Sequence, residues 1–176
     1  MSSQSMAPVM VPSHLLQKSS INSYNVSYYS YFSLYQLLGK DLFNKCLKEY
    51  MDTWKYKHPT PFDFMFTFNK VSGTDLDWFW KKWYFDWGYM DIGIKSFKDN
   101  ILTVENFGGR PMPFTIQINY VDQTSLLEEV NPVVWTDESI YRKKVDTKKE
   151  IASIEIKILA NGDAVEYNNM LTIKKR

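Results

Sequence analysis

Four tyrosines close together near the start of the chain could supply hydroxyl groups for chemistry. They are Tyr24, Tyr28, Tyr29 and Tyr31. A tyrosine hydroxyl can donate a hydrogen bond to the oxyanion that forms when a nucleophile attacks a carbonyl group. Tyrosine-rich helices are far more often packing surfaces, so the cluster by itself favours a structural role.

A second aromatic run, Asp77–Trp87, contains four tryptophans. Exposed indole rings could stack on a sugar or lie at a membrane interface. The helical spacing of the run explains most of these rings as core residues, because they recur on one helix face. We expect Trp78 to be the ring that stays exposed.

Metal chemistry has little support in the sequence. The only histidines are His14 and His58, and neither belongs to an H-E-x-x-H sequence. A catalytic zinc site requires about three protein ligands on one face. We therefore predict no metal site and no cofactor in this chain, and we interpret His58 as a side chain at a helix end.

Three other reactive residues have structural interpretations. Asp75 and Asp77 fall in the first turn of an expected helix, where carboxylates are favoured by the helix dipole and by free N–H groups. Cys46 falls on the apolar face of another expected helix, so we expect a core residue rather than a nucleophile. A single cysteine also excludes an internal disulfide.

Composition excludes several classes of function. The 176 residues include 21 basic and 20 acidic side chains, for a net charge of +1. This balance provides no excess positive field for a nucleic acid. No stretch reaches the roughly 18 apolar residues of a membrane span. Residues 1–7 lack the basic and apolar regions of a secretory signal. The sequence does not determine the cellular compartment.

Helical signals fill the first half of the chain. An apolar run over residues 23–38 stops at Gly39, and apolar residues then recur at steps of three and four as far as Trp54. Thr60-Pro61-Phe62-Asp63 is a strong helix start, and Thr74–Asp77 repeats the signal for a fourth helix. Short connections predict a packed antiparallel array of four helices.

The pattern changes to an alternation of period two after Gly88. Residues 116–120 and 154–158 alternate between apolar and polar side chains, and turn clusters stand at 98–100, 108–111 and 161–163. Residues 1–90 also hold 22 of the 29 aromatic residues. We therefore predict an α+β fold, with a helical subdomain at 1–90 and an antiparallel β-sandwich of six or seven strands at 91–176.

The order and spacing of four segments also resemble a known family. The segments are Gly39–Phe43, Tyr50, Trp54–Phe64 and Ser72–Trp80. They are similar to the C-terminal half of the catalytic domain of zinc aminopeptidases of the alanyl aminopeptidase and leukotriene hydrolase family, which are gluzincin peptidases. The resemblance covers about residues 20–90, and the remainder resembles the β-sandwich that follows this domain in bacterial members.

The resemblance implies zinc-dependent hydrolysis in the family, but the zinc-binding H-E-x-x-H helix and the later glutamate ligand precede the matched part. The family's next functional residue is a tyrosine that stabilises the tetrahedral intermediate. Counting back from Gly39 without a gap places it at Tyr24, in a sequence that departs from the family's Tyr-x-Lys-Gly or Tyr-x-Lys-Pro. Deletion of one helical turn would place it at Tyr28 or Tyr29 instead.

Two functions follow as expectations. The first is the C-terminal part, or a truncated relative, of a zinc aminopeptidase, which binds peptide substrate only when joined to a zinc-binding half. By itself this chain should not hydrolyse peptides. The second is a non-catalytic module that assembles with itself or with a protein partner through an exposed aromatic helical face. The family's relatives are often exported, and substrate preference is not encoded in this part.

Overall fold

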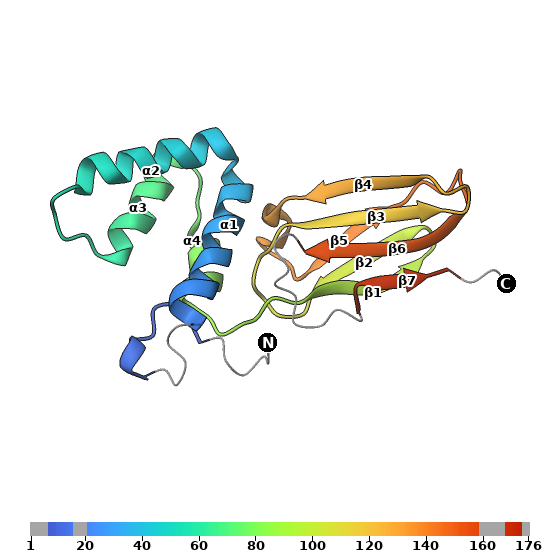
Figure 1. Cartoon of the computed structure of the whole chain (residues 1–176), viewed down its shortest axis with the longest axis horizontal. Coiled ribbons are helices and arrows are strands. Elements are labelled where there is room, and N and C mark those ends of the chain that lie inside the picture. Colours follow the sequence, from blue (N-terminus) through green and yellow to red (C-terminus); the bar gives the residue numbers. More distant parts are fainter. Residues whose placement is uncertain (1–6, 16–20, 159–167, 174–176) are drawn as a thin grey trace.

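The computed structural model describes residues 7–15, 21–158 and 168–173. Helices come first along the chain and strands follow, as Figure 1 shows. This arrangement confirms the predicted α+β fold class. The predicted turn at 161–163 lies outside the described residues. Within them, no helix is both long and apolar enough to cross a bilayer.

The first long helix, α1 (Ser27–Leu38), continues from a π-helical turn, η3 (Ile21–Val26), and a short 3-10 turn, η2 (Ser13–Leu15), lies further upstream. Gly39 ends α1 with φ at 76°, a conformation that glycine adopts without a steric cost. The chain then turns into α2 (Lys40–Trp54), which runs across α1 in Figure 1, whereas the sequence predicts an antiparallel arrangement. Gly39 therefore acts as the predicted helix stop.

The third helix, α3 (Pro61–Ser72), starts where the sequence predicts. Both the N–H and the hydroxyl of Thr60 donate to Asp63 Oδ2, each at 2.7 Å. These bonds satisfy groups that a helix start otherwise leaves without a partner. Gly73 ends the helix in the left-handed conformation, with φ at 65°.

The fourth helix differs from its prediction in length and in which ring it exposes. It comprises α4 (Asp77–Trp80) and a π-helical continuation, η4 (Lys81–Phe85). Asp86 has an extended backbone, so the helix ends before Trp87, which is 72% exposed. Trp78 is only partly exposed, because Lys82 Nζ lies over its ring at 5.6 Å from the centroid. The expectation that Trp78 would be the exposed ring is wrong.

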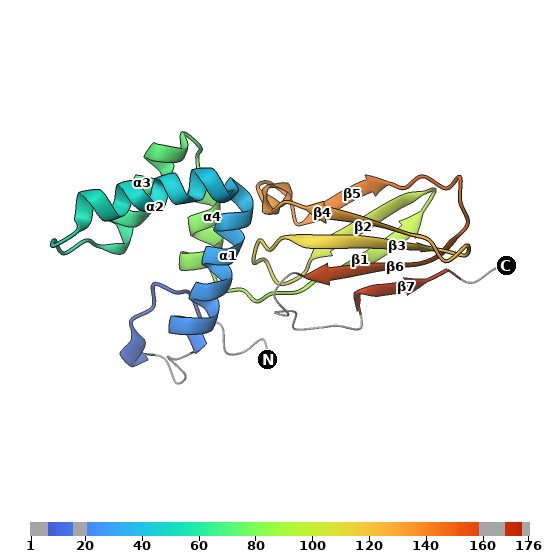
Figure 2. The ribbon, with the colours of Figure 1, turned by 45° about the horizontal axis from the view of Figure 1, so that its top comes forward.

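The strands form two antiparallel sheets packed face to face (Figure 2). One sheet has the order β1 (Ile92–Lys98), β2 (Ile101–Asn106) and β5 (Ile140–Lys144). The other has the order β4 (Ser125–Val130), β3 (Phe114–Tyr120), β6 (Ile151–Ile158) and β7 (Met170–Thr172). A 3-10 turn, η5 (Pro132–Trp135), connects β4 to β5.

The alternating isoleucines form the core of the sandwich, as the period-two pattern predicts. Ile116 stands opposite Ile156 and Ile118 opposite Ile154 in the register of β3 and β6, and all four side chains are buried. Cross-strand pairs of β-branched residues stabilise such a sheet. At the turn predicted for residues 98–100, Asp99 and Asn100 both have positive φ and connect β1 to β2.

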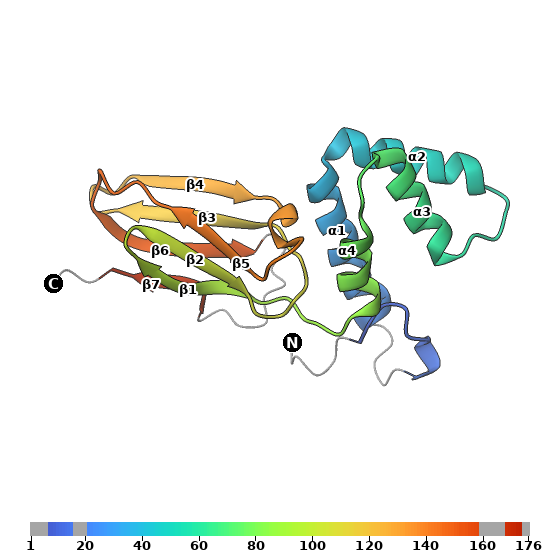
Figure 3. The ribbon, with the colours of Figure 1, turned by 180° about the vertical axis from the view of Figure 1, so that it is seen from behind.

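The helical region meets one end of the sandwich through α1 (Figure 3). Ser33 Oγ donates to the carbonyl of Pro111, and Asn131 Nδ2 donates to the carbonyl of Gln36 at 2.8 Å. Buried apolar residues of both regions form one continuous cluster. The division into domains at 1–90 and 91–176 stays a prediction.

Arg110 strengthens this junction from the sandwich side. Its side chain is fully buried, its Nη1 donates to the carbonyls of Lys82 and Trp83, and its guanidinium lies 5.4 Å from the centroid of the Trp83 ring. Burial lowers the pKa of Arg110 to about 10. The guanidinium therefore stays charged at neutral pH, and its Nη1 supplies the donor to two backbone carbonyls within η4.

Candidate functional site

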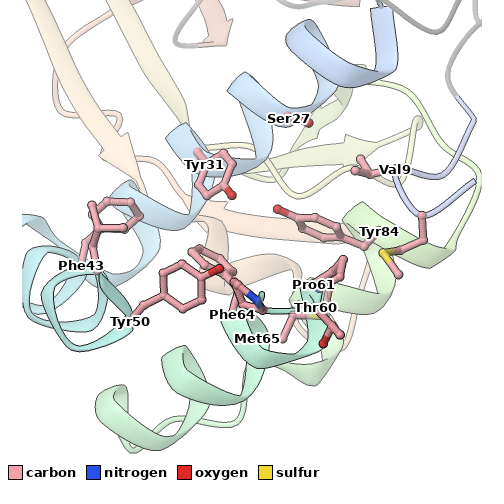
Figure 4. A pocket seen from close by; sticks show the side chains of 13 residues that line it. Val9, Ser27, Tyr31, Phe43, Tyr50, Thr60, Pro61, Phe64, Met65 and Tyr84 are labelled. Carbon is pink, nitrogen blue, oxygen red and sulfur yellow. The ribbon is translucent and has the colours of Figure 1, made fainter. Parts of the chain in front are cut away.

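A cavity of about 670 Å³ opens among the helices (Figure 4). Its walls come from α1, α2, α3, η4 and the N-terminal segment. The apolar lining residues are Val9, Met10, Phe43, Leu47, Pro59, Pro61, Phe64 and Met65. Hydroxyl-bearing side chains complete the lining, namely Ser27, Tyr31, Tyr50, Thr60 and Tyr84. Its volume lies within the range typical of small-ligand pockets.

Helical spacing places these side chains together. Ser27 and Tyr31 are four residues apart on α1, and Phe43, Leu47 and Tyr50 follow steps of four and three on α2. The N-terminal segment is held in place because the N–H of Met10 donates to the carbonyl of Tyr84 at 3.1 Å. Residues that are distant in sequence therefore line the same cavity.

Aromatic contacts fix the orientation of the tyrosine rings. Phe64 lies between Tyr31 and Tyr50, with ring centroids 5.5 Å and 5.1 Å away and nearly perpendicular planes. Such edge-to-face pairs are favoured by the quadrupoles of the rings. The phenol hydroxyls of Tyr31, Tyr50 and Tyr84 consequently point toward the cavity in Figure 4.

Tyr84 lies deepest among the hydroxyl residues and is 8% exposed. Its hydroxyl lies 3.3 Å from Ser30 Oγ, and Ser30 Oγ donates in turn to the carbonyl of Ser27 at 2.8 Å. Burial raises the pKa of Tyr84 above its usual range. Burial also raises the pKa of Tyr31. Both phenols are therefore neutral at physiological pH and act through hydrogen bonds.

The tyrosines that the sequence singled out separate into two groups. Tyr24 is 75% exposed and lies outside the cavity lining. Tyr28 is exposed and stacks on Phe32 at 6.3 Å between centroids, while Tyr29 is partly buried beside it. Only Tyr31 of this cluster lines the cavity. The oxyanion role at Tyr24 stays a prediction.

The residues present do not fit a zinc ion of the kind that the resembled family holds. His14 and His58 are both exposed side chains. Among the described residues, no group of three or more histidine, cysteine, aspartate or glutamate side chains is placed to hold a metal ion. We therefore assign no zinc-dependent reaction step to the described residues of this chain.

The other reactive residues have the structural roles that the sequence predicts. Cys46 is fully buried, and burial raises the pKa of its thiol, so the reactive thiolate is disfavoured. Asp75 Oδ1 accepts a hydrogen bond from the N–H of Asp77 at 2.9 Å, at the start of α4. Asp77 Oδ1 accepts from Asn69 Nδ2 at 2.7 Å. Both carboxylates therefore stabilise the helix start.

Sequence reasoning did not identify Ser27, Tyr50 or Tyr84 as lining residues, nor Ser30, which contacts Tyr84 from outside the lining. Tyr50 and Tyr84 fit the apolar faces of their helices, so the pattern identified them only as core residues. Ser30 carried no signal, although it is 1% exposed and connects Tyr84 to the backbone. A hydroxyl in an otherwise apolar helix face is the one feature that could have marked Ser30, because a buried hydroxyl needs a partner.

No protein-family model matches the sequence, and no curated protein matches it. The fold is similar to a solved structure, that of Legionella pneumophila aminopeptidase A in complex with aspartic acid. The TM-score is 0.54 at 16% sequence identity, over 73% of this chain and 16% of that chain. The chain thus spans a small part of that aminopeptidase, and the similarity is one of fold.

Proposed function

We propose that this chain is the C-terminal part, or a truncated relative, of a zinc aminopeptidase of the gluzincin type, and that by itself it does not hydrolyse peptides. The observation that supports this most is the fold: helices followed by a sandwich that together are similar to part of aminopeptidase A. The segments 39–43, 54–64 and 72–80 support it independently, through their resemblance to the same class of enzyme.

The first test measures activity and metal in the purified chain. We expect no release of fluorophore from a panel of aminoacyl-coumarin substrates and no stoichiometric zinc by elemental analysis after dialysis. Two exposed histidines cannot provide the three protein ligands of a catalytic site. One tightly held zinc ion per chain, or turnover by the chain alone, would overturn the proposal.

The second test supplies the missing part. A segment that carries H-E-x-x-H and the later glutamate, encoded in frame upstream at the source locus, is expressed separately and mixed with this chain. Recovery of aminopeptidase activity is the expected result. A source locus that encodes no such segment would favour a role without catalysis.

In a reconstituted enzyme, Tyr24 is the proposed donor to the oxyanion. Tyr24→Phe should lower kcat by roughly 10²–10³-fold with little change in KM, because the lost hydrogen bond acts on charge that develops in the transition state. Tyr28→Phe and Tyr29→Phe are matched controls and should have much smaller effects. A larger loss in either control would support the alignment with one helical turn deleted.

A second candidate function, a non-catalytic assembly module, is supported by exposed rings. Tyr24, Tyr28 and Tyr31 recur at steps of four and three along one side of the η3–α1 helix, with exposures of 75%, 56% and 42%. Exposed apolar patches often mark interfaces. Light scattering should then show a dimer or a larger assembly, and Tyr24→Lys with Tyr28→Lys should return the 20.8 kDa monomer. A monomer in the unmodified chain at high concentration would exclude self-assembly.

A further inference from the structure

The cavity among the helices has the lining of a site for an uncharged ring. None of the described residues that line it carries a formal charge. An ionised ligand group buried there would lose its hydration without gaining a counter-charge, which is costly. Rings and aliphatic side chains provide apolar contact instead, and three phenols provide the polar contacts. The lining therefore selects a neutral, mostly apolar ligand group with a polar atom.

The direction of the hydrogen bonds narrows the chemistry of that polar atom. A hydroxyl has a single proton to donate. Ser30 donates its proton to the carbonyl of Ser27, so in the 3.3 Å contact between Ser30 and Tyr84 the phenol must be the donor. Tyr84 has then no proton left for the cavity. The Tyr31 hydroxyl is also a hydrogen-bond neighbour of Tyr84 and donates its proton to the Tyr84 oxygen. A ligand that reaches these two oxygens must therefore approach with an N–H or an O–H.

We propose that this cavity binds a neutral aromatic group that carries a hydrogen-bond donor, such as a phenol or an indole, with the donor directed at the neighbouring oxygens of Tyr31 and Tyr84. Tyr31 and Phe64 contribute aromatic rings to the lining, and Leu47 of α2 and Met65 of α3 contribute apolar side chains. The site lies within this chain's own helices and N-terminal segment. It is therefore independent of the aminopeptidase proposal.

The probe is p-cresol, added to the full chain labelled with ¹³C at the methionine methyl groups. Met10 and Met65 line the cavity, whereas Met170 lies on β7 and serves as an internal reference. We expect saturable shifts of the Met10 and Met65 signals with a Kd on the order of 1 mM, typical of a ligand with eight heavy atoms, and no shift of Met170. No saturable shift at ten times that concentration would overturn the proposal.

The donor is tested with a matched probe. In 4-methylanisole the phenol oxygen is methylated, so the molecule keeps its ring but can only accept a hydrogen bond. It should bind about 3–10-fold more weakly than p-cresol. Tyr84→Phe should remove this difference by weakening p-cresol alone. Equal binding of the two probes to the unmodified chain would refute the donor assignment.

A variant that fills the cavity tests the location. Leu47→Trp places an indole at the wall contributed by α2 and should abolish the shifts caused by p-cresol. Met51→Trp introduces the same side chain one turn later on α2, at an exposed position outside the lining, and should leave binding unchanged. If Leu47→Trp binds p-cresol like the unmodified chain, the cavity is not the site. The probe pair keeps the proposal testable if this variant fails to fold.

A phenol can come from a free small molecule or from a tyrosine side chain of a peptide. N-acetyltyrosinamide distinguishes the two sources, because it carries the phenol on a peptide-like backbone. Tighter binding than p-cresol, lost in Leu47→Trp, would identify a peptide side chain as the natural ligand. Weaker binding than p-cresol would identify a free aromatic molecule. Absence of binding by both probes would overturn the proposal.

Discussion

In the helical region rings pack on rings, whereas in the sandwich branched aliphatic side chains pack across paired strands. Phe64 and Phe68 lie 4.3 Å apart between centroids, and the Phe68 ring also meets Trp80 at 6.3 Å, nearly at right angles. In the sandwich, Ile116 and Ile118 face isoleucines of β6 in register. Both regions contribute to the same buried cluster.

The two packing styles leave different surfaces. The helical region has a cavity of about 670 Å³ and exposed rings such as Phe62 and Phe66. In the sandwich, side chains from the inner faces of the two sheets form the core, and Ile116 and Ile156 are both buried. The cavity for which we propose a ligand therefore lies in the helical region.

The largest expected effect comes from the aromatic core. Phe68 is fully buried, so Phe68→Ala should lower the free energy of unfolding by about 3–5 kcal/mol, because it removes apolar contact and leaves a cavity. Ile154→Val, at a fully buried position of the sandwich, should cost only about 0.5–1.5 kcal/mol. Denaturant unfolding followed by circular dichroism measures both. A loss below about 1 kcal/mol for Phe68→Ala would contradict the assignment of this ring to a closely packed core.

Arg110→Met is expected to weaken the junction between the two regions by about 2–3 kcal/mol, since the carbonyls of Lys82 and Trp83 would lose their donor. Tryptophan fluorescence reports mainly on the helical region, which has five of the six tryptophans. This signal should then change at a lower temperature than the infrared amide I band of the β-strands. Arg142→Met is the control, because Arg142 is an exposed side chain with one 3.6 Å ion pair to Glu138. A single coincident transition in Arg110→Met would contradict a weakened junction.

Alkaline pH should destabilise the cavity wall through Tyr84. The folded state raises the pKa of this phenol, so its contribution is complete below the unfolded pKa of about 10 and declines as pH rises beyond it. Tyr84→Phe should reduce stability at neutral pH by about 1 kcal/mol through loss of the bond to Ser30. It should also flatten the decline above about pH 10. Tyr28→Phe, outside the cavity, should leave the slope unchanged. Unfolding free energies between pH 7 and 11 provide the measurement.

The smallest effect concerns the start of α3. Asp63→Ala removes the acceptor of two 2.7 Å bonds from Thr60 and should cost about 1 kcal/mol. Asp41→Ala, in the first turn of α2, should cost about 0.3 kcal/mol, because it affects mainly the helix dipole. Thermal unfolding compares the two variants. Similar losses would show that the capping bonds add nothing beyond the charge.

Local signals in the sequence determined most of the elements. Gly39, Pro61 and Gly73 mark helix ends because their backbones permit or forbid particular dihedral angles without reference to distant residues. The alternation in residues 116–120 and 154–158 fixes the buried face of two strands for the same reason, since side chains alternate along any strand. These predictions are confirmed because their causes lie within a few residues.

Tertiary structure decided the rest. Trp87 is exposed because η4 ends at Asp86 and the chain then turns toward the sandwich. Trp78 is only partly exposed because the Lys82 ammonium group lies over its ring. The cavity is likewise lined by residues from separate segments, namely Met10, Tyr31, Tyr50 and Tyr84. No local sequence pattern indicates that these side chains lie close together. The partner of a buried hydroxyl is set by packing among segments far apart in the chain. The sequence therefore identified Tyr84 as a core residue, and only the tertiary structure shows that its hydroxyl faces the cavity.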